Sequence, residues 1–477
     1  AHLIAYTVCM DELILDILMQ LRDGSQGALD THQLEMLINS HNSGIDSSAH
    51  STEREKLIPK RAILPYFLQV KQNNDELWQS WNVTPELEEK FIRSVRMKPR
   101  RTASGVATIT VITRPHTCSS NCIYCPCDLR MPKSYLANEP ACQRAELTFF
   151  DPYVQVAARL QALHQMGHST DKVELIVLGG TWSDYPEGYQ YWFIKELFRA
   201  LNEWPSSPNH IQERLNWYTS FGLQNSEDAL SSFVAEQQAA VFDDTATYNQ
   251  AFHKLYDTSQ PHQSAWSQMQ STYDELVEQQ HVNETAAARV VGLVIETRPD
   301  TITPDNLRMF RQLGCTKIQI GIQSTRQEIL DANQRQMNVA QIKRAFSLIR
   351  LYGFKIHSHL MVNLLGATPE ADKQDFKTFV TDPGFLPDEI KLYPCALVSG
   401  TQLVQKYREG TWQPYAKDEL VDVLVQDVLA TPPYVRISRM IRDISATDIL
   451  VGNKHTNLRQ MVEQELAAKD VASRVQE

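Results

Sequence analysis

Residues 115–126 read Pro-His-Thr-Cys-Ser-Ser-Asn-Cys-Ile-Tyr-Cys-Pro and place Cys118, Cys122 and Cys125 in a Cys-x3-Cys-x2-Cys array. The array follows residues 106–113, an apolar run typical of a β-strand. Three thiolates on one short loop can ligate three irons of a 4Fe-4S cube and leave the fourth iron open. An open iron suits S-adenosylmethionine, which binds through its amino and carboxylate groups. The array therefore predicts radical chemistry.

A zinc site is the alternative for the same three cysteines. A structural zinc ion normally takes four ligands, and Cys127 and His116 are the nearby residues that can supply a fourth. A disulfide framework is not expected, because the cysteines outside the array are scattered along the chain and indicate a reducing compartment such as the cytoplasm. Those cysteines are Cys9, Cys127, Cys142, Cys315 and Cys395.

Composition predicts a cytoplasmic protein of two or three units, since 477 residues with 42% hydrophobic content supply more than one core. No apolar run approaches a membrane span, so we expect no membrane contact. The net charge of −11 argues against nucleic-acid binding if the charge is spread evenly. Residues 91–101 reverse that expectation locally, because they carry a cluster of lysines and arginines.

From residue 98 onward, strand-like and helix-like segments alternate. The strand-like segments are 106–113, 173–178, 290–296, 317–322, 355–362 and 389–393. Helical patterns such as 153–164 and 189–201 separate them. This alternation predicts an α/β fold with a parallel sheet and right-handed crossovers. Six strand–helix units predict a partial (β/α)6 barrel rather than a closed eight-stranded one.

The rest of the chain falls outside this alternation. Residues 203–283 are rich in Gln, Ser, Asp and His, but they include helical stretches such as 229–241, so we expect an inserted helical segment rather than disorder. Four parts result: an N-terminal helical unit at 1–97, a barrel at 98–202 and 284–400, the insertion at 203–283, and a C-terminal helical and linker segment at 401–477.

Polar and glycine residues gather where the predicted strands end, and chemistry belongs at that edge of a barrel. The residues are Gly179, Gly180 and Thr181 after the second strand, Glu296 and Arg298 at the third, and Gln323 and Ser324 at the fourth. We interpret them as binding the methionine and ribose of S-adenosylmethionine. An ordinary tight turn at the glycines and a surface ion pair between Glu296 and Arg298 are the alternatives.

Three residues on the last two predicted strands are candidates for catalysis. His359 lies two positions after His357, so both side chains point to one face of the fifth strand. Lys391 and Tyr393 share one face of the sixth strand, where a cation and a phenol can bind phosphate or thioester groups. Ordinary core packing is the alternative for all three.

These motifs together resemble the catalytic subunit of Elongator and its bacterial and archaeal relatives, which modify the wobble uridine of tRNA. The resemblance covers roughly residues 61–202 and 290–475. The matching stretches include Arg101-Thr102-Ala103-Ser104-Gly105, the cysteine array, Gly179-Gly180-Thr181, residues 295–300, Gly321-Ile322-Gln323-Ser324 and Lys391-Leu392-Tyr393-Pro394.

The resemblance implies a two-part reaction at the tRNA anticodon stem-loop. Reductive cleavage of S-adenosylmethionine on the 4Fe-4S cluster gives a 5'-deoxyadenosyl radical, which removes hydrogen from the methyl group of acetyl-CoA. The resulting radical attacks carbon 5 of the uridine, and thioester hydrolysis leaves 5-carboxymethyluridine. An electron donor is implied as a partner. No acetyltransferase sequence follows Arg459, so acetyl-CoA is expected from a missing domain or a separate partner.

Basic residues in two regions are candidates for RNA contact, because a phosphate contact needs a reachable positive head group. They are Arg93, Arg96, Lys98, Arg100 and Arg101 before the barrel, and Arg436, Arg439 and Arg442 in the last segment. Solvated surface charge is the alternative for each. Two other functions stay open: a tRNA-binding or assembly subunit with a structural cluster, and a radical enzyme that acts on a small molecule.

Overall fold

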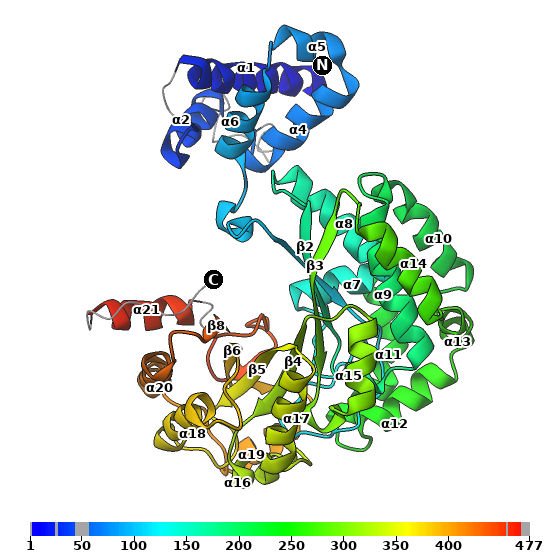
Figure 1. The fold of residues 1–477 in the computed structure, drawn as a ribbon, viewed down its shortest axis with the longest axis vertical. Coiled ribbons are helices and arrows are strands. Elements are labelled where there is room, and N and C mark those ends of the chain that lie inside the picture. The colour runs from blue at the N-terminus through cyan, green and yellow to red at the C-terminus, as the bar shows by residue number, and fades with distance from the viewer. Residues whose placement is uncertain (1, 24–26, 43–56, 455–456, 469–477) are drawn as a thin grey trace. The chain divides into compact units, whose positions relative to one another are not determined.

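The structure, a computed structural model, describes residues 2–23, 27–42, 57–454 and 457–468 (Figure 1). The chain divides into two compact units. The first comprises Ala1–Thr108 and Ala158–Val173, and the second comprises Ile109–Ala157 and Glu174–Glu477. The expected helical unit at residues 1–97 falls wholly within the first of these.

The first unit is built on a bundle of helices. They are α1 (His2–Asp23), α2 (Thr31–Asn42), α4 (Lys60–Asn73), α5 (Asp75–Ser80) and α6 (Pro85–Val95). Helix α6 begins where the sequence favours a start: the Thr84 side chain accepts a hydrogen bond from the Leu87 amide, and Pro85 occupies the first turn. In the core, the ring of Phe67 stacks on Phe91, with centroids 4.1 Å apart, and on Trp81, at 5.9 Å.

The second unit carries most of a seven-stranded sheet with the order β1-β2-β3-β4-β5-β6-β8. The strands are β1 (Ala107–Ile112), β2 (Lys172–Leu178), β3 (Arg289–Thr297), β4 (Lys317–Gln323), β5 (Lys355–Val362), β6 (Glu389–Pro394) and β8 (Arg436–Arg439). Strands β3 to β6 and β8 pair in parallel. The sheet curls into a partial barrel (Figure 1), so the predicted fold class is confirmed.

Strand β8 is a seventh strand that the sequence pattern does not predict. Its sequence, Arg-Ile-Ser-Arg, has one apolar residue and therefore no alternating pattern to read. It forms because the exposed edge of β6 offers unpaired peptide groups, and Ile437 pairs with Ile390 there. A second small sheet joins β7 (Leu397–Val398) and β9 (Ile449–Val451) in antiparallel fashion.

Helices separate the strands and cover the outside of the sheet (Figure 1). They are α7 (Pro140–Leu147), α8 (Pro152–Gln165), α9 (Glu187–Asn202), α15 (Pro304–Gln312), α16 (Gln327–Ala332), α17 (Val339–Leu351), α18 (Pro369–Thr381), α19 (Leu403–Arg408) and α20 (Lys417–Ala430). Helix α21 (Leu458–Ala468) follows the last strand and packs against α20. The side chains of Thr303, Asn338 and Thr368 cap α15, α17 and α18. Within the described residues, no helix is long and apolar enough to cross a membrane.

The insertion is helical, as predicted. It contains α10 (Ile211–Ser220), α11 (Glu227–Phe242), α12 (Tyr248–Phe252), α13 (Gln260–Ser267) and α14 (Tyr273–Asn283), with a π-helical turn at His253–Asp257. Buried Asp151 anchors it, because its carboxylate accepts hydrogen bonds from Arg214, at 2.8 Å, and from the Tyr218 hydroxyl, at 2.7 Å. Helix α14 packs against α9.

We predict that Phe67→Ala destabilises the first unit by about 3–5 kcal/mol, because it removes a fully buried ring from the aromatic stack. Met36→Ala is the control, since the Met36 side chain is 61% exposed, and it should shift the free energy of unfolding by less than about 0.5 kcal/mol. Urea unfolding of the full chain measures both changes. Equal shifts for the two variants would contradict this packing.

Candidate metal and cofactor site

The cysteine array lies on the loop between β1 and α7, where β1 ends. Cys122 is buried, and Cys118 and Cys125 are half-buried. The sulfur of Cys118 lies 3.6 Å from Thr181 Oγ1. The sulfur of Cys122 accepts a hydrogen bond from Arg335 Nη1, at 3.3 Å, and lies 3.2 Å from Ser120 Oγ. The loop therefore presents its thiols to the carboxyl ends of the strands.

Two cations are buried against these thiols. Arg335 donates from Nη1 to Cys122 and from Nη2 to the Gly321 carbonyl. Lys133 Nζ donates to Ser120 O, at 3.1 Å, and to Asn121 Oδ1, at 3.2 Å. Burial lowers the pKa of Lys133, but the nearby cysteines outweigh burial and raise it. Both cations can balance the negative charge that thiolate ligands bring to a buried cluster.

The thiols differ in acidity because they differ in surroundings. Burial acts to raise the pKa of Cys122, but Arg335 and then Ser120 outweigh it and lower that pKa to about 7. Burial raises the pKa of Cys125 to about 12, and Lys133 opposes it only in part.

The spacing of the thiols bears on which metal group they fit. One tetrahedral zinc ion would draw its sulfur ligands to within about 4 Å of one another, given Zn–S bonds of about 2.3 Å. Among the described residues, the His, Cys, Asp and Glu groups whose ligand atoms all lie within 4.8 Å of one another do not include this array. A cube makes no such demand, because each thiolate meets a different iron.

The Gly179-Gly180 pair is required by a close approach. Gly179 has φ +155°, and a Cβ there would lie 1.7 Å from Thr113 Oγ1. Gly180 has φ +83°, and a Cβ there would lie 3.0 Å from the Lys133 carbonyl oxygen. No side chain fits at Gly179, so the end of β2 can approach the cysteine loop and place Thr181 beside Cys118.

Glu296 and Arg298 do not form the ion pair that was the alternative for them. Glu296 accepts a hydrogen bond from the Tyr135 hydroxyl, and its other oxygen lies 3.9 Å from His359 Nδ1. Arg298 instead makes a bidentate pair with Asp300, at 2.8 and 2.9 Å. Glu296 therefore faces the barrel interior.

The two residues at the end of β4, Gln323 and Ser324, differ in their hydrogen bonding. Gln323 has φ +72°, unusual for a residue with a side chain, and its Oε1 is buried with no hydrogen-bond partner among the described residues. Ser324 donates its hydroxyl hydrogen to Asp375 of α18, at 2.5 Å. Gln323 is thus free to meet a ligand, whereas the hydroxyl of Ser324 is engaged in holding the helix.

His359, Lys391 and Tyr393 come together inside the barrel. His359 pairs with Lys391 across β5 and β6, and its ring centroid lies 5.8 Å from that of Tyr393. Lys391 Nζ donates to Gln319 Oε1, at 2.8 Å. His359 Nε2 and Gln319 Nε2 are buried and have no hydrogen-bond partner among the described residues. Such orphaned polar atoms fit a site that takes a polar ligand.

Burial dominates the titration of this group. It raises the pKa of Tyr393 to about 12 and lowers the pKa of Lys391 to about 8, where the charge of Glu296 opposes it. Burial, and then Lys391, holds the pKa of His359 well below its ordinary value. At neutral pH the phenol is therefore protonated, the imidazole is neutral and the lysine is mostly charged.

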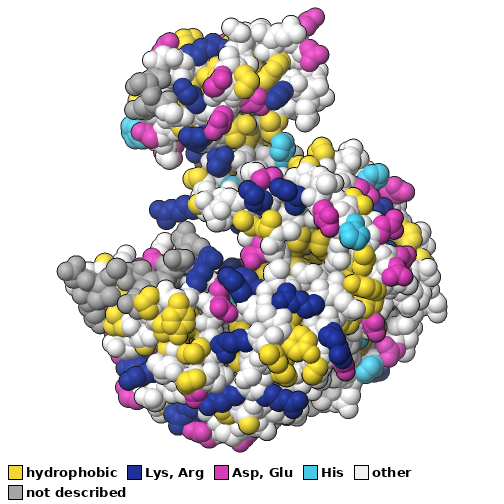
Figure 2. Space-filling view, viewed as in Figure 1, with side chains coloured by type: hydrophobic (Ala, Val, Ile, Leu, Met, Phe, Trp, Pro, Cys, Tyr) yellow, Lys and Arg dark blue, Asp and Glu magenta, His cyan; other side chains and the backbone are white. Residues whose placement is uncertain are grey.

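The basic residues divide into two kinds. Lys98, Arg100 and Arg101 are exposed at a short 3₁₀ helix in the first unit (Pro99–Thr102), Arg96 is half-buried and Arg93 pairs with Glu89 at 2.7 Å. In the second unit, Arg436 is exposed. Figure 2 shows lysine and arginine side chains of that unit spread among acidic and apolar ones.

Arg439 and Arg442 are held by the protein itself. Arg439 pairs with Asp443, at 2.5 Å, and Arg442 pairs with Glu139, at 2.7 Å, while its guanidinium lies 5.1 Å from the ring centroid of Tyr135. Arg442 is therefore part of the wall beside Tyr135 and Glu296.

Sequence reasoning missed Arg335, Lys133 and Gln319. Arg335 lies in the loop between α16 and α17, where Gln334 and Gln336 both have positive φ. No sequence motif includes these three residues. Glutamine rarely adopts positive φ, so the sequence around Arg335 gives no sign of this loop conformation. Lys133 lies eight positions after Cys125, and this closeness to the array is the one signal that could have drawn attention to it.

Two family models match parts of the chain that follow the cysteine loop in sequence. Residues 264–378 match the Radical SAM superfamily, and residues 387–468 match the Radical_SAM C-terminal domain. The chain therefore carries a radical SAM domain. More particularly, it is similar over about four fifths of its length to members of the Elongator catalytic subunit family, as the resemblance of its motifs indicated.

Two curated relatives and one solved structure show this similarity. The chain is 33% identical over 82% of its length to a tRNA uridine(34) acetyltransferase of Methanocaldococcus infernus, covering 62% of that relative. It is 29% identical over 80% of its length to Elongator complex protein 3 of Homo sapiens, covering 59% of it. The structure of Methanocaldococcus infernus Elp3 with residues 1–46 deleted superposes with a TM-score of 0.55 at 30% identity, over 78% of this chain and 65% of that one. The chain thus spans about three fifths of the length of these relatives.

We predict that Gly179→Ala disrupts the site, because its Cβ would overlap Thr113 Oγ1. Iron content after anaerobic reconstitution should fall well below that of the wild type. Gly410→Ala is the matched control, since Gly410 also has positive φ, at +73°, but has nothing within 4 Å of its Cβ position. It should lose about 1–2 kcal/mol of stability and keep its iron. Equal iron loss in both variants would contradict the close-approach argument.

Lys391 should make the stability of the protein depend on alkaline pH. Its pKa is about 8 when folded and about 10.4 in an unfolded chain, so between these values the unfolded state binds more protons. Stability therefore gains from Lys391 as pH rises from 8 to about 10.5, by at most about 3 kcal/mol. Urea unfolding of wild type and Lys391→Met at several pH values measures this gain. The free energy of unfolding of the wild type should rise relative to that of the variant as pH rises. Parallel pH profiles would show an unshifted lysine.

Proposed function

We propose that this chain is the radical SAM part of a cytoplasmic tRNA-modifying enzyme that acts on carbon 5 of the wobble uridine. The proposed product is 5-carboxymethyluridine, made with a carbon radical derived from acetyl-CoA. The observation that carries the proposal is the cysteine loop with its two buried cations, facing orphaned polar groups at the strand ends. Similarity to a tRNA uridine(34) acetyltransferase supports tRNA uridine as the substrate class.

Cys118, Cys122 and Cys125 would hold three irons of a 4Fe-4S cluster. When bound with S-adenosylmethionine and reduced by an electron donor, that cluster supplies a 5'-deoxyadenosyl radical. Arg335 and Lys133 would balance the charge of the thiolates. The methionine and ribose parts of S-adenosylmethionine would be bound by Thr181, which lies beside Cys118, and by Gln323, whose Oε1 has no partner among the described residues.

The barrel interior would orient the acetyl group. Protonated Tyr393 and charged Lys391 can donate hydrogen bonds to a thioester carbonyl, which aims the methyl group at the cluster. Neutral His359, held near Glu296, can accept a proton when the thioester is later hydrolysed. A buried site also protects a carbon radical from side reactions with groups in solution.

Exposed Lys98, Arg100 and Arg101 in the first unit are the proposed phosphate contacts. The anticodon loop is single-stranded, so presenting its uridine costs little unpairing energy. Because the chain spans about three fifths of its relatives, acetyl-CoA is proposed to come from a further domain or a partner.

A tRNA-binding or assembly subunit whose cluster is structural remains the second candidate function. It is favoured by the same short coverage of relatives. Cleavage of S-adenosylmethionine separates the two candidates, because a structural cluster has no use for an open iron.

We predict that the reconstituted chain, with dithionite and S-adenosylmethionine, releases 5'-deoxyadenosine under anaerobic conditions. Total tRNA with acetyl-CoA should increase the yield severalfold, because hydrogen removal from the substrate makes cleavage irreversible. Liquid chromatography with mass detection measures the nucleoside. Cys122→Ala is the blank and should release none.

A charge-reversal variant tests the RNA contact in the same assay. Lys98→Glu with Arg101→Glu should keep basal cleavage and lose the stimulation by tRNA, whereas Arg308→Glu on α15, 66% exposed, should keep both. A fully loaded cluster that cleaves nothing would favour the binding subunit. Cleavage that ignores tRNA would favour a small-molecule substrate.

A further inference from the structure

The insertion reaches back to the cysteine loop and hydrogen-bonds its backbone at several points. We propose that Gln238, Tyr248, Asn249 and Tyr256 form a backbone clamp that holds the cysteine loop in the conformation that receives the cluster. The role of the clamp in cluster binding rests on the proposed function. The hydrogen bonds of the clamp to the loop do not depend on that function. These four act as positioning residues.

Asn249 holds the first cysteine of the array. Its Oδ1 accepts a hydrogen bond from the Cys118 amide, at 3.1 Å, and its Nδ2 donates to the Cys118 carbonyl, at 2.8 Å. One side-chain amide thus satisfies both backbone groups of one residue, as a neighbouring strand would. Because both peptide groups are fixed, the direction of the Cα–Cβ bond that carries the thiol is fixed as well.

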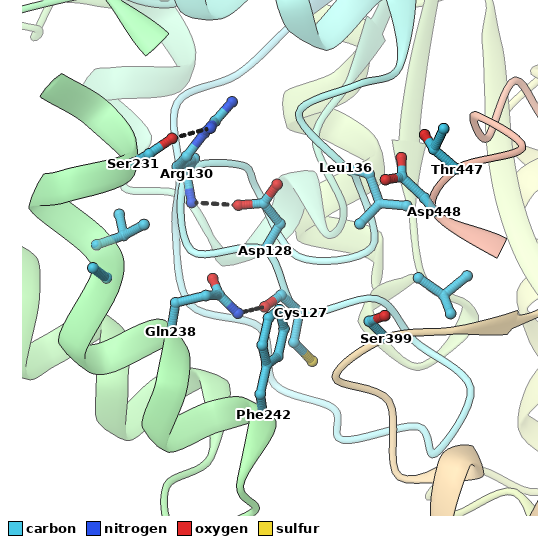
Figure 3. A pocket seen from close by; sticks show the side chains of 13 residues that line it. Cys127, Asp128, Arg130, Leu136, Ser231, Gln238, Phe242, Ser399, Thr447 and Asp448 are labelled. Atoms are coloured by element: carbon cyan, nitrogen blue, oxygen red, sulfur yellow. Dashed lines mark hydrogen bonds between the residues drawn. The ribbon is translucent and has the colours of Figure 1, made fainter. Parts of the chain in front are cut away.

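Gln238 of α11 makes the same kind of double contact after the last cysteine. Its Nε2 donates to the Cys127 carbonyl, at 2.8 Å (Figure 3). Its Oε1 accepts from the Leu129 amide, also at 2.8 Å. Two phenols extend this contact. Tyr256 donates to the Leu129 carbonyl and Tyr248 to the Met131 carbonyl, both at 2.7 Å. The array is therefore held on both sides.

The start of the loop is also packed against the insertion. The guanidinium of Arg114 lies 4.0 Å from the ring centroid of Trp266 in α13 and 4.8 Å from that of Tyr189 in α9. The pKa of Arg114 is lowered by burial, with the tyrosines opposing it. Stacking on Trp266 fixes the chain four residues before Cys118.

The loop needs such support because residues 113–139 contain no helix or strand. Peptide groups in irregular, half-buried backbone need partners, and side-chain amides and phenols supply them here. A ligand loop that is held before the metal group binds loses less conformational freedom on binding. The insertion is thus a structural part of the cluster site rather than a separate module.

Asn249→Ala tests the clamp in the apo chain. Losing both hydrogen bonds should raise local opening of the loop about tenfold to hundredfold. Hydrogen exchange of peptides that cover residues 115–131, and the rate of iodoacetamide labelling of Cys118, measure this opening without any cluster. Asn216→Ala is the matched control. Exposed Asn216 accepts a hydrogen bond on its side chain from Gln212 of the same helix, away from the cysteine loop, so the variant should leave both rates unchanged.

Two further measurements separate positioning from general stability. Asn249→Asp keeps the acceptor for the Cys118 amide and loses the donor, so its opening rate should lie between those of wild type and Asn249→Ala. The reconstituted, reduced cluster of Asn249→Ala should show changed EPR g-values and faster iron loss to a chelator, while the unfolding midpoint of the second unit stays close to that of Asn216→Ala.

The clamp is overturned if Asn249→Ala exchanges and labels like Asn216→Ala. Its role toward the cluster is overturned if the loop opens but the EPR spectrum and iron loss match the wild type. If the wild-type chain takes up no iron, the proposed function is contradicted. The clamp is still tested in that case, because hydrogen exchange and iodoacetamide labelling are measured on the apo loop.

Discussion

Keeping three cysteine side chains together on a buried, irregular loop is the constraint on which the second unit depends. As thiolate ligands they would repel one another in a medium of low polarity, so the loop would then need cations at short range. Arg335 meets Cys122 directly, and Lys133 binds the backbone and side chain of the adjacent residues. Both are buried, so their charge is little screened by solvent. A neutral loop of the same shape would have no need of either residue.

The parallel sheet serves the same constraint. Strands that run in one direction bring their carboxyl ends to one edge, so Thr181, Glu296 and Gln323, from three strands, face one region with the cysteine loop. The Gly179-Gly180 turn removes the side chains that would keep β2 away from that loop. Backbone conformation is unusual in the same place, at Gln323 and around Arg335, which is typical of functional sites.

The insertion gives the site a third source of order. Radical SAM chemistry is expected to use the strand ends, yet the backbone contacts to the loop come from Gln238, Asn249 and the tyrosines of a segment rich in polar residues. A polar composition usually indicates a loop or disorder. In this segment the polar side chains include amides that hydrogen-bond to peptide groups of the loop. The helices stay ordered because Tyr248, Phe252 and Tyr256 pack on Leu129.

The local sequence pattern was enough to identify the three cysteines, the six long strands and the helical nature of the insertion. Ligand spacing and hydrophobic periodicity depend on residues that are close together in the sequence. It was not enough to find β8, whose four residues become a strand only beside β6. Nor could it pair Arg335 with Cys122, 213 positions away, or Asn249 with Cys118, 131 positions away. Contacts at such separations arise when the chain folds back on itself, so the tertiary structure alone decided which charges and amides surround the thiols.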